Sequence, residues 1–127
     1  MYHVPSNILS SENVEINLTV VQEICDNDPT LLKKLATTFI KTSYDNIQKL
    51  NEYIINEDPV QLKNTAHACR SSLSIFKCSD LYDLMLNIES ITQQKENSSL
   101  IKEMIGIGTV KFQLMINLLI IEFELND

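Results

Sequence analysis

Hydrophobic residues recur at intervals of three and four along most of this chain. The clearest case is a stripe formed by Leu62, Ala66, Cys69, Leu73 and Phe76. This spacing places all of them on one side of an α-helix, so that side is expected to face a core. Asp58 and Pro59 precede the stripe and are typical of a helix start, because aspartate caps free backbone amides and proline suits the first helical position. The pattern predicts a helix from Pro59 to about Phe76.

Similar patterns predict further helices on both sides of this one. A short helix is expected from Asn17, its cap, to about Cys25, and a long helix from Pro29 to about Ile55. The apolar stripe of the long helix consists of Leu32, Leu35, Phe39, Ile47, Leu50 and Ile54, interrupted by Ser43. Another helix is expected to follow Ser79, which would cap it. Its buried side is predicted to consist of Leu81, Leu84, Met85, Ile88 and Ile91.

The last part of the chain is apolar at a helical spacing from Leu100 to Leu125. Gly106 and Gly108 lie within it and favour a kink or a short break. The polar stretch 93–99 is expected to be a loop. Short connections between long amphipathic helices favour antiparallel neighbours. The sequence therefore predicts an all-α fold, an up-and-down antiparallel four-helix bundle with a short additional N-terminal helix.

The first fifteen residues, 1–15, carry few apolar side chains in no regular period, so an extended lead-in is expected there. Residues 16–127 would then form the helical domain. A chain of 127 residues with 44% hydrophobic residues is sufficient for a single core of ordinary size.

Composition limits the classes of partner. Ten basic and 17 acidic residues give a formal net charge of −7. This balance argues against nucleic acid or an anionic membrane as the partner, because both bind basic patches. The longest uninterrupted apolar run, Leu118 to Ile121, is too short to span a bilayer, and no secretory signal is visible. A protein partner, a cytoplasmic location and a monomeric state are expected.

The three cysteines, Cys25, Cys69 and Cys78, show no paired spacing. They are expected to be reduced packing residues. No CxxC or HxxxH pattern is present, so no metal site is predicted.

His67 is one residue away from the apolar stripe of its helix. Its neighbours along the same side of the helix are Lys63, Arg70, Ser71 and Ser74. On periodicity alone, a single histidine at such a place is most often a polar surface residue. An exposed imidazole between two cations is also suited to carrying a phosphoryl dianion, because both cations would form charge-assisted hydrogen bonds with it. The spacing alone leaves both interpretations open.

The run AHACRSSLSIFKCSDLYDLMLNIE, residues 66–89, resembles the histidine-containing phosphotransfer (HPt) domain of two-component phosphorelays. The residues that match its signature are Ala66, His67, Arg70, Ser71, Ser72, Leu81 and Glu89. The resemblance extends upstream to Ile16. The family usually has lysine in place of Arg70, glycine in place of Ser71, and glycine at the turn where Lys77 stands.

The resemblance implies that His67 accepts a phosphoryl group from the aspartyl phosphate of a receiver domain and passes it to another receiver. Arg70 and Lys63 would supply positive charge. The chain would be a phosphocarrier in signal transduction and not an enzyme with its own ATP site. It would need no cofactor, since magnesium is expected on the partner receiver. The partners would be receiver domains of response regulators or hybrid histidine kinases.

The predicted docking surface for the receiver combines Ser71, Ser72 and Ser74 with Ile40 and Tyr44, which lie on the flank of the long helix. Packing against the short first helix would explain Ile40 and Tyr44 equally well. An alternative function is a helical module that carries no phosphate and inhibits a receiver or histidine kinase by docking on it. A third is a helical interaction domain in which His67 is incidental.

Overall fold

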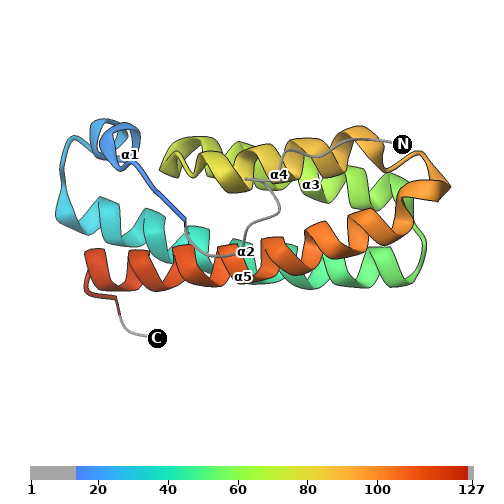
Figure 1. The fold of residues 1–127 in the computed structure, drawn as a ribbon. Helices are drawn as coiled ribbons and strands as arrows, with labels where there is room; N and C mark the ends of the chain where they lie inside the picture. The colour runs from blue at the N-terminus through green and yellow to red at the C-terminus, as the bar shows by residue number, and fades with distance from the viewer. Residues whose placement is uncertain (1–13, 126–127) are drawn as a thin grey trace.

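The computed structural model describes residues 14–125, which fold into helices and contain no strand (Figure 1). The elements are α1 (Thr19–Ile24), α2 (Pro29–Ile55), α3 (Pro59–Phe76), α4 (Ser79–Ile91), the 3-10 turn η1 (Lys95–Asn97) and α5 (Ser98–Glu122). The all-α class predicted from the sequence is confirmed. Residues 1–13, most of the predicted lead-in, lie outside the described range, and the predicted loop 93–99 contains η1 and the start of α5.

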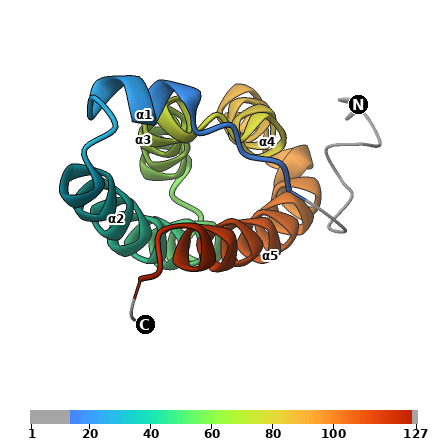
Figure 2. The same cartoon turned by 90° about the vertical axis from the view of Figure 1, so that its left-hand side faces the viewer.

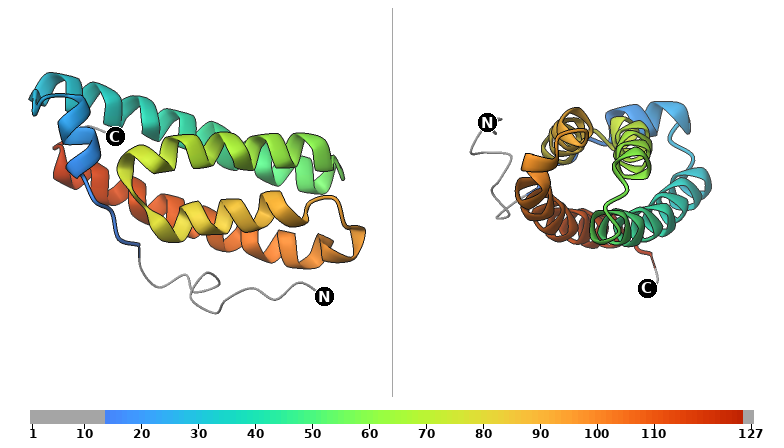
Figure 3. Two further views of the ribbon diagram at one scale, coloured as in Figure 1. Left: turned by 90° about the horizontal axis from the view of Figure 1, so that it is seen from above. Right: turned by 90° about the vertical axis from the view of Figure 1, so that its right-hand side faces the viewer.

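Helices α2 to α5 lie beside one another in a bundle-like arrangement around a common core (Figure 2). Helix α2 packs against α3 and α5, and α4 packs against the same two helices. Viewed along the helices, α3 and α4 form one side of the molecule and α2 and α5 form the other (Figure 3). These sides are named the α3–α4 face and the α2–α5 face. The short helix α1 packs against α3.

Side-chain caps fix where α2 and α3 begin. The Asp28 carboxylate accepts a hydrogen bond from the Thr30 amide at 2.9 Å, and Asp58 accepts one from the Gln61 amide at 3.2 Å. The proline after each aspartate stands at the first helical position, as the sequence predicted. Asn17 was expected to cap α1, but it lies one residue before the capping position, which Leu18 holds without a side-chain hydrogen bond. The Asn17 side chain accepts a hydrogen bond from the Thr19 amide at 2.9 Å.

The connection between α3 and α4 differs from the prediction. Ser79 was expected to cap α4, but it is the first helical residue, and the capping position is held by Cys78 without a side-chain hydrogen bond. Lys77 ends α3 in the left-handed conformation, with φ of 52°. Glycine adopts this conformation at the least cost, so a lysine here carries some backbone strain.

The predicted stripes of α3 and α4 are confirmed, because every one of their residues is buried. In α2 the prediction is right in part. Leu32, Phe39 and Leu50 are buried, whereas three other predicted members, Leu35, Ile47 and Ile54, are only partly buried. The buried face of α2 also contains Ala36, Ser43 and Asn46. The buried face of α2 is therefore rotated slightly relative to the predicted apolar stripe, and it includes two polar side chains.

The predicted kink in the last helix is wrong, because α5 is continuous from Ser98 to Glu122. A Cβ atom at Gly108 would lie 3.3 Å from Leu84 Cδ2 and from Met85 Cε, whereas one at Gly106 would meet nothing within 4 Å. Gly108 is therefore a place where α5 and α4 approach closely. A glycine that serves close packing does not need to break the helix.

Helix α5 is apolar on more than its buried side. It has 25 residues and a mean hydropathy of 1.8 in its most apolar 18-residue window, and 44% of that window is buried. By length and composition it would be able to cross a membrane, but the core helix of a globular domain can have the same properties. The uninterrupted apolar run Leu118 to Ile121 is too short to reveal this property, which extends over the whole helix.

Candidate functional site

The predicted phospho-acceptor, His67, lies on the outer side of α3, and 63% of its side chain is exposed. Its Nδ1 atom is 2.9 Å from Oε1 of Glu89 on the neighbouring helix α4. Because Nδ1 faces α4, the other ring nitrogen, Nε2, lies on the far side of the ring. This orientation leaves Nε2 accessible to an incoming group.

Glu89 is held by Arg70, which lies one turn beyond His67. Arg70 donates from Nε to Glu89 Oε2 at 2.7 Å and from Nη2 to Oε1 at 3.2 Å, so the contact is bidentate. Only 19% of the Arg70 side chain and 14% of the Glu89 side chain are exposed. The hydrogen bonds from Arg70 hold the pKa of Glu89 below its usual value, and the bond to His67 acts in the same direction. Glu89 is therefore an ionised acceptor next to the imidazole.

Tyr82 completes the cluster. Arg70 Nη1 donates to the Tyr82 hydroxyl at 3.1 Å, and the Arg70 Cζ atom lies 5.4 Å from the centre of the Tyr82 ring. Tyr82 and Glu89 are seven residues apart on α4, which places them on the same side of that helix. Together they immobilise the guanidinium group of Arg70. Residues His67, Arg70, Glu89 and Tyr82 are named the His67 network.

The tautomer of His67 follows from two competing contacts at Nδ1. Glu89 Oε1 lies at 2.9 Å and Arg70 Nη2 at 3.0 Å. A protonated Nδ1 donates to the carboxylate, while an unprotonated Nδ1 accepts from the guanidinium. We assign the proton to Nδ1, because Arg70 Nη2 already has Glu89 as an acceptor and a hydrogen bond to an ionised carboxylate is strong. In this tautomer Nε2 carries the free lone pair.

The predicted basic residues take different places. Arg70 contacts His67 on the Nδ1 side, away from the position that a group on Nε2 would occupy. Lys63 is exposed one turn before His67 and makes no ion pair within residues 14–125. The sequence did not distinguish these two cations. In the structure Arg70 is part of the network, and Lys63 is free to approach a ligand.

Three of the five predicted docking residues are close to His67 in the chain. Only two of these three line the surface beside the His67 side chain. An open hollow between α3 and α4 is lined by His67, Arg70, Ser71, Ser74 and Tyr82. Ser74 donates its hydroxyl to the Ser71 carbonyl at 2.7 Å, and Ser72 is half-buried outside the hollow. Small side chains thus border the imidazole on the side toward the α3–α4 turn.

Ile40 and Tyr44 are not brought together with His67. They line a separate hollow between α2 and α5, where the Tyr44 hydroxyl lies 3.4 Å from the Gln113 side chain. This hollow belongs to the α2–α5 face, on the opposite side of the molecule (Figure 2). Ile40 and Tyr44 therefore lie outside the hollow beside His67.

Glu89 and Tyr82 were not among the predicted site residues. Glu89 was noted only as part of the resemblance. One signal was present: both residues directly follow members of the buried stripe of α4, Leu81 and Ile88, and share one edge of it. An acid and a tyrosine at such an edge are placed to reach the next helix.

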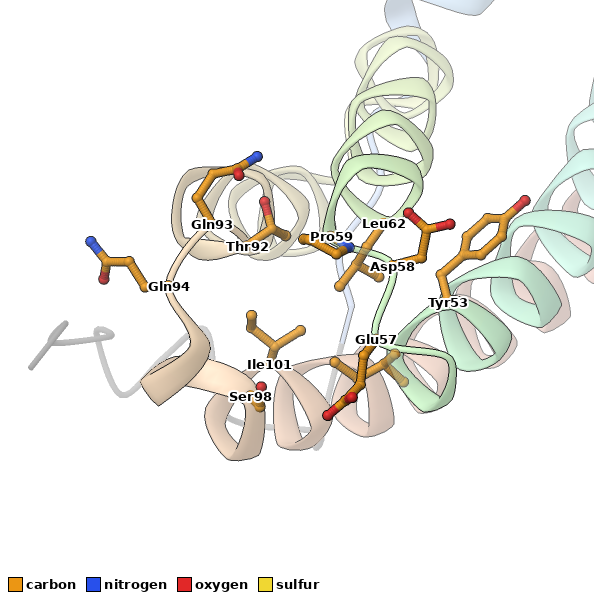
Figure 4. Close-up of a pocket in the computed structure, with 11 residues that line it drawn as sticks. Tyr53, Glu57, Asp58, Pro59, Leu62, Thr92, Gln93, Gln94, Ser98 and Ile101 are labelled. Carbon is orange, nitrogen blue, oxygen red and sulfur yellow. The ribbon is translucent and has the colours of Figure 1, made fainter.

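A pocket of about 150 Å³ lies at one end of the bundle, where the α2–α3 and α4–α5 connections meet (Figure 4). Its lining comprises Tyr53, Ile54, Glu57, Asp58, Pro59, Leu62, Thr92, Gln93, Gln94, Ser98 and Ile101. Asp58 is already engaged as the cap of α3. None of the His67 network lines this pocket.

Within residues 14–125, no group of three or more histidine, cysteine, aspartate or glutamate side chains is arranged to hold a metal ion. The three cysteines are free and buried, as expected of packing residues. Burial raises the pKa of Cys69 to about 12 and that of Cys78 to about 11, so both are unreactive thiols near neutral pH.

Comparison with protein-family models, curated proteins and solved structures gave no match for this chain.

Proposed function

We propose that this chain is a phosphorelay intermediate of the HPt type, built as a four-helix bundle with the short extra helix α1. His67 would accept a phosphoryl group from the aspartyl phosphate of a receiver domain and pass it to another receiver. One observation carries this proposal: Nδ1 of an exposed histidine lies 2.9 Å from an ionised carboxylate. With the proton assigned to Nδ1, the Nε2 lone pair is open to solvent. An incidental surface histidine would not need a fixed ring.

The transfer step balances without any further reactant. The Nε2 lone pair of His67 attacks phosphorus, the N–P bond forms, and the P–O bond to the receiver's aspartate breaks. The aspartate leaves as a carboxylate with the bonding electrons. Nδ1 keeps its proton, so the phosphorylated ring is positively charged. Transfer to a second receiver is the reverse of the same step.

Glu89 is suited to stabilise that positive ring. It accepts the Nδ1 proton in a hydrogen bond before the reaction and faces the developing imidazolium charge during it. Arg70 keeps Glu89 ionised and in place through the bidentate contact. We therefore assign Arg70 a positioning role and leave direct contact with the phosphoryl oxygens to Lys63 and to the partner.

The receiver class is inferred from the chemistry that the chain lacks. The sequence shows no phosphate-binding glycine-rich loop with its lysine, so the phosphoryl donor is expected to come with the partner. An acyl phosphate is reactive enough to phosphorylate an imidazole reversibly. The small side chains of Ser71 and Ser74 next to His67 leave room for the donor domain.

The test uses phosphoramidate, a small donor that phosphorylates imidazoles without a protein partner, and then a panel of phosphorylated receiver domains. Incorporation of one acid-labile phosphoryl group, followed by transfer to a receiver, is expected. The chain has two histidines and phosphoramidate can phosphorylate either, so the receiver is the discriminating donor: His67→Gln should abolish labelling by a phosphorylated receiver and the matched variant His3→Gln should not. Labelling by phosphoramidate without transfer to or from any receiver would favour the inhibitory module. Labelling by a phosphorylated receiver that persists in His67→Gln would refute the assignment.

A further inference from the structure

Helix α5 presents a second apolar stripe to solvent. Ile121 is 74% exposed, and Val110 and Leu118 are also exposed. Leu114 lies between them and Ile107 lies one turn before Val110, on the same side of the helix, and both are partly exposed. These five residues are named the outer stripe. Val110, Leu114, Leu118 and Ile121 were expected to belong to the apolar pattern of the last helix, because a helix that is apolar all round does not show which side faces the core.

The outer stripe is symmetric about its central residue. Ile107 and Ile121 are each seven residues from Leu114, and Val110 and Leu118 are each four residues from it. Intervals of four and seven lie along one line of a helix surface. A stripe that reads the same in both directions is complementary to itself when two copies run antiparallel.

The distribution of charged residues on α5 also favours two antiparallel copies. Between Met104 and Ile121 the only charged residue is Lys111, which is buried with its Nζ 3.6 Å from Asp80 Oδ2. The outer surface of this segment is therefore uncharged, as the centre of an interface usually is. Glu122 and Glu124 stand at its C-terminal end. A parallel pair would bring these four carboxylates together, whereas an antiparallel pair separates them and opposes the helix dipoles.

We propose that the outer stripe of α5 binds a second copy of this chain, with the two α5 helices antiparallel and Leu114 on the two-fold axis. Ile107 of each copy would pack against Ile121 of the other. A stripe about 20 Å long on one helix is small for a protein interface, so a weak, reversible dimer is expected. The dimer leaves the His67 network open, because α5 packs against α2 and α4 and lies across the bundle from α3 (Figure 2).

Sedimentation velocity from about 10 μM to about 1 mM chain tests the proposal. The mass should rise with concentration toward two chains in the wild type, and Ile121→Lys should weaken association at least about tenfold. The matched control is Ile55→Lys, because Ile55 is 72% exposed and ends α2 outside the outer stripe. A wild type that stays monomeric, or equal weakening by both variants, would overturn the dimer. Circular dichroism verifies that each variant is helical.

Cross-linking with a short bis-maleimide tests the orientation, since the native cysteines are buried. In an antiparallel pair, Ile107→Cys should cross-link to Ile121→Cys in a mixture, while Ile121→Cys alone should not, because its two copies lie about 20 Å apart. Cross-linking of Ile121→Cys to itself would refute this arrangement.

Binding of a monomeric wild type to phosphatidylcholine vesicles would show that a membrane covers the stripe instead. Phosphoramidate should label Ile121→Lys as it labels the wild type. The proposed dimer can therefore fail independently of the proposed phosphotransfer.

Discussion

The imidazole of His67 and the carboxylate of Glu89 are joined at 2.9 Å although they are 22 residues apart and lie on different helices. The contact links the exposed ring to the boundary of the core, because Glu89 is almost fully covered and is itself fixed by Arg70. It determines which ring nitrogen has a free lone pair. Substitutions at these two residues should separate this electronic role from simple structural support.

His67→Gln should remove phosphoryl acceptance with little effect on folding. The side chain is mostly exposed, and glutamine is a good helix former, so the free energy of unfolding should change by less than about 1 kcal/mol. Chemical denaturation of the two proteins measures it. A much larger loss would mean that the ring is needed to hold Glu89 and Arg70 together.

Glu89→Gln should slow receiver-to-His67 transfer by about tenfold to a hundredfold, because a neutral amide cannot stabilise the imidazolium as a carboxylate does. Nitrogen NMR of the His67 ring should show a smaller fraction of the Nδ1–H tautomer than in the wild type. The control is Glu103→Gln, which removes the same charge from an exposed place on α5. Unchanged transfer and tautomer in Glu89→Gln would rule out the role proposed for this carboxylate.

The same carboxylate predicts a pH dependence of stability. Arg70 lowers the folded-state pKa of Glu89 below the ordinary 4.5, so its contribution to stability is complete above 4.5 and is lost as the pH falls through the lowered folded-state value. Urea unfolding between about pH 6 and about pH 3 should show a steeper fall for the wild type than for Glu89→Gln. Parallel curves would show that Glu89 is not held ionised by the fold.

The helical stripes explain why much of the fold was predictable. The stripe from Leu62 to Phe76 is buried as expected, because a regular apolar period on a capped helix has only one favourable orientation. Helix α5 is the opposite case. Its apolar residues surround the helix, so their period does not indicate that Met104 is buried and Ile121 exposed.

The candidate site was predictable only within one helix. His67, Arg70 and Ser71 share a side of α3, and local spacing was enough to group them. Glu89 and Tyr82 come from α4, and their contact with Arg70 depends on how α4 is rotated against α3. Side-chain periodicity does not give that rotation between helices. For this reason the role proposed for Arg70 changes from a direct phosphoryl ligand to the group that positions Glu89.

Arg70 and Lys63 should therefore respond differently to substitution by alanine. Arg70→Ala leaves a nearly buried carboxylate without its bidentate partner, so a loss of stability of about 1.5 to 3 kcal/mol is expected together with slower transfer. Lys63→Ala should slow transfer and leave stability within about 0.5 kcal/mol, because Lys63 is exposed. Unfolding and transfer measured on both variants test this. The proposed division of roles fails if Arg70→Ala impairs only transfer.

The last prediction concerns the face on which a receiver docks. Ser71 lines the hollow beside His67, so the longer side chain of Ser71→Gln should hinder an approaching receiver and slow transfer, while labelling by the small donor phosphoramidate stays near the wild-type rate. Tyr44→Ala is the comparison on the α2–α5 face, where it removes only a 3.4 Å contact to Gln113, and it should leave both rates unchanged. The two donors separate docking from chemistry, because only the receiver needs room around the helix. If Tyr44→Ala slows transfer from the receiver and Ser71→Gln does not, the docking surface includes the α2–α5 face, and the position of the receiver over the α3–α4 face is wrong.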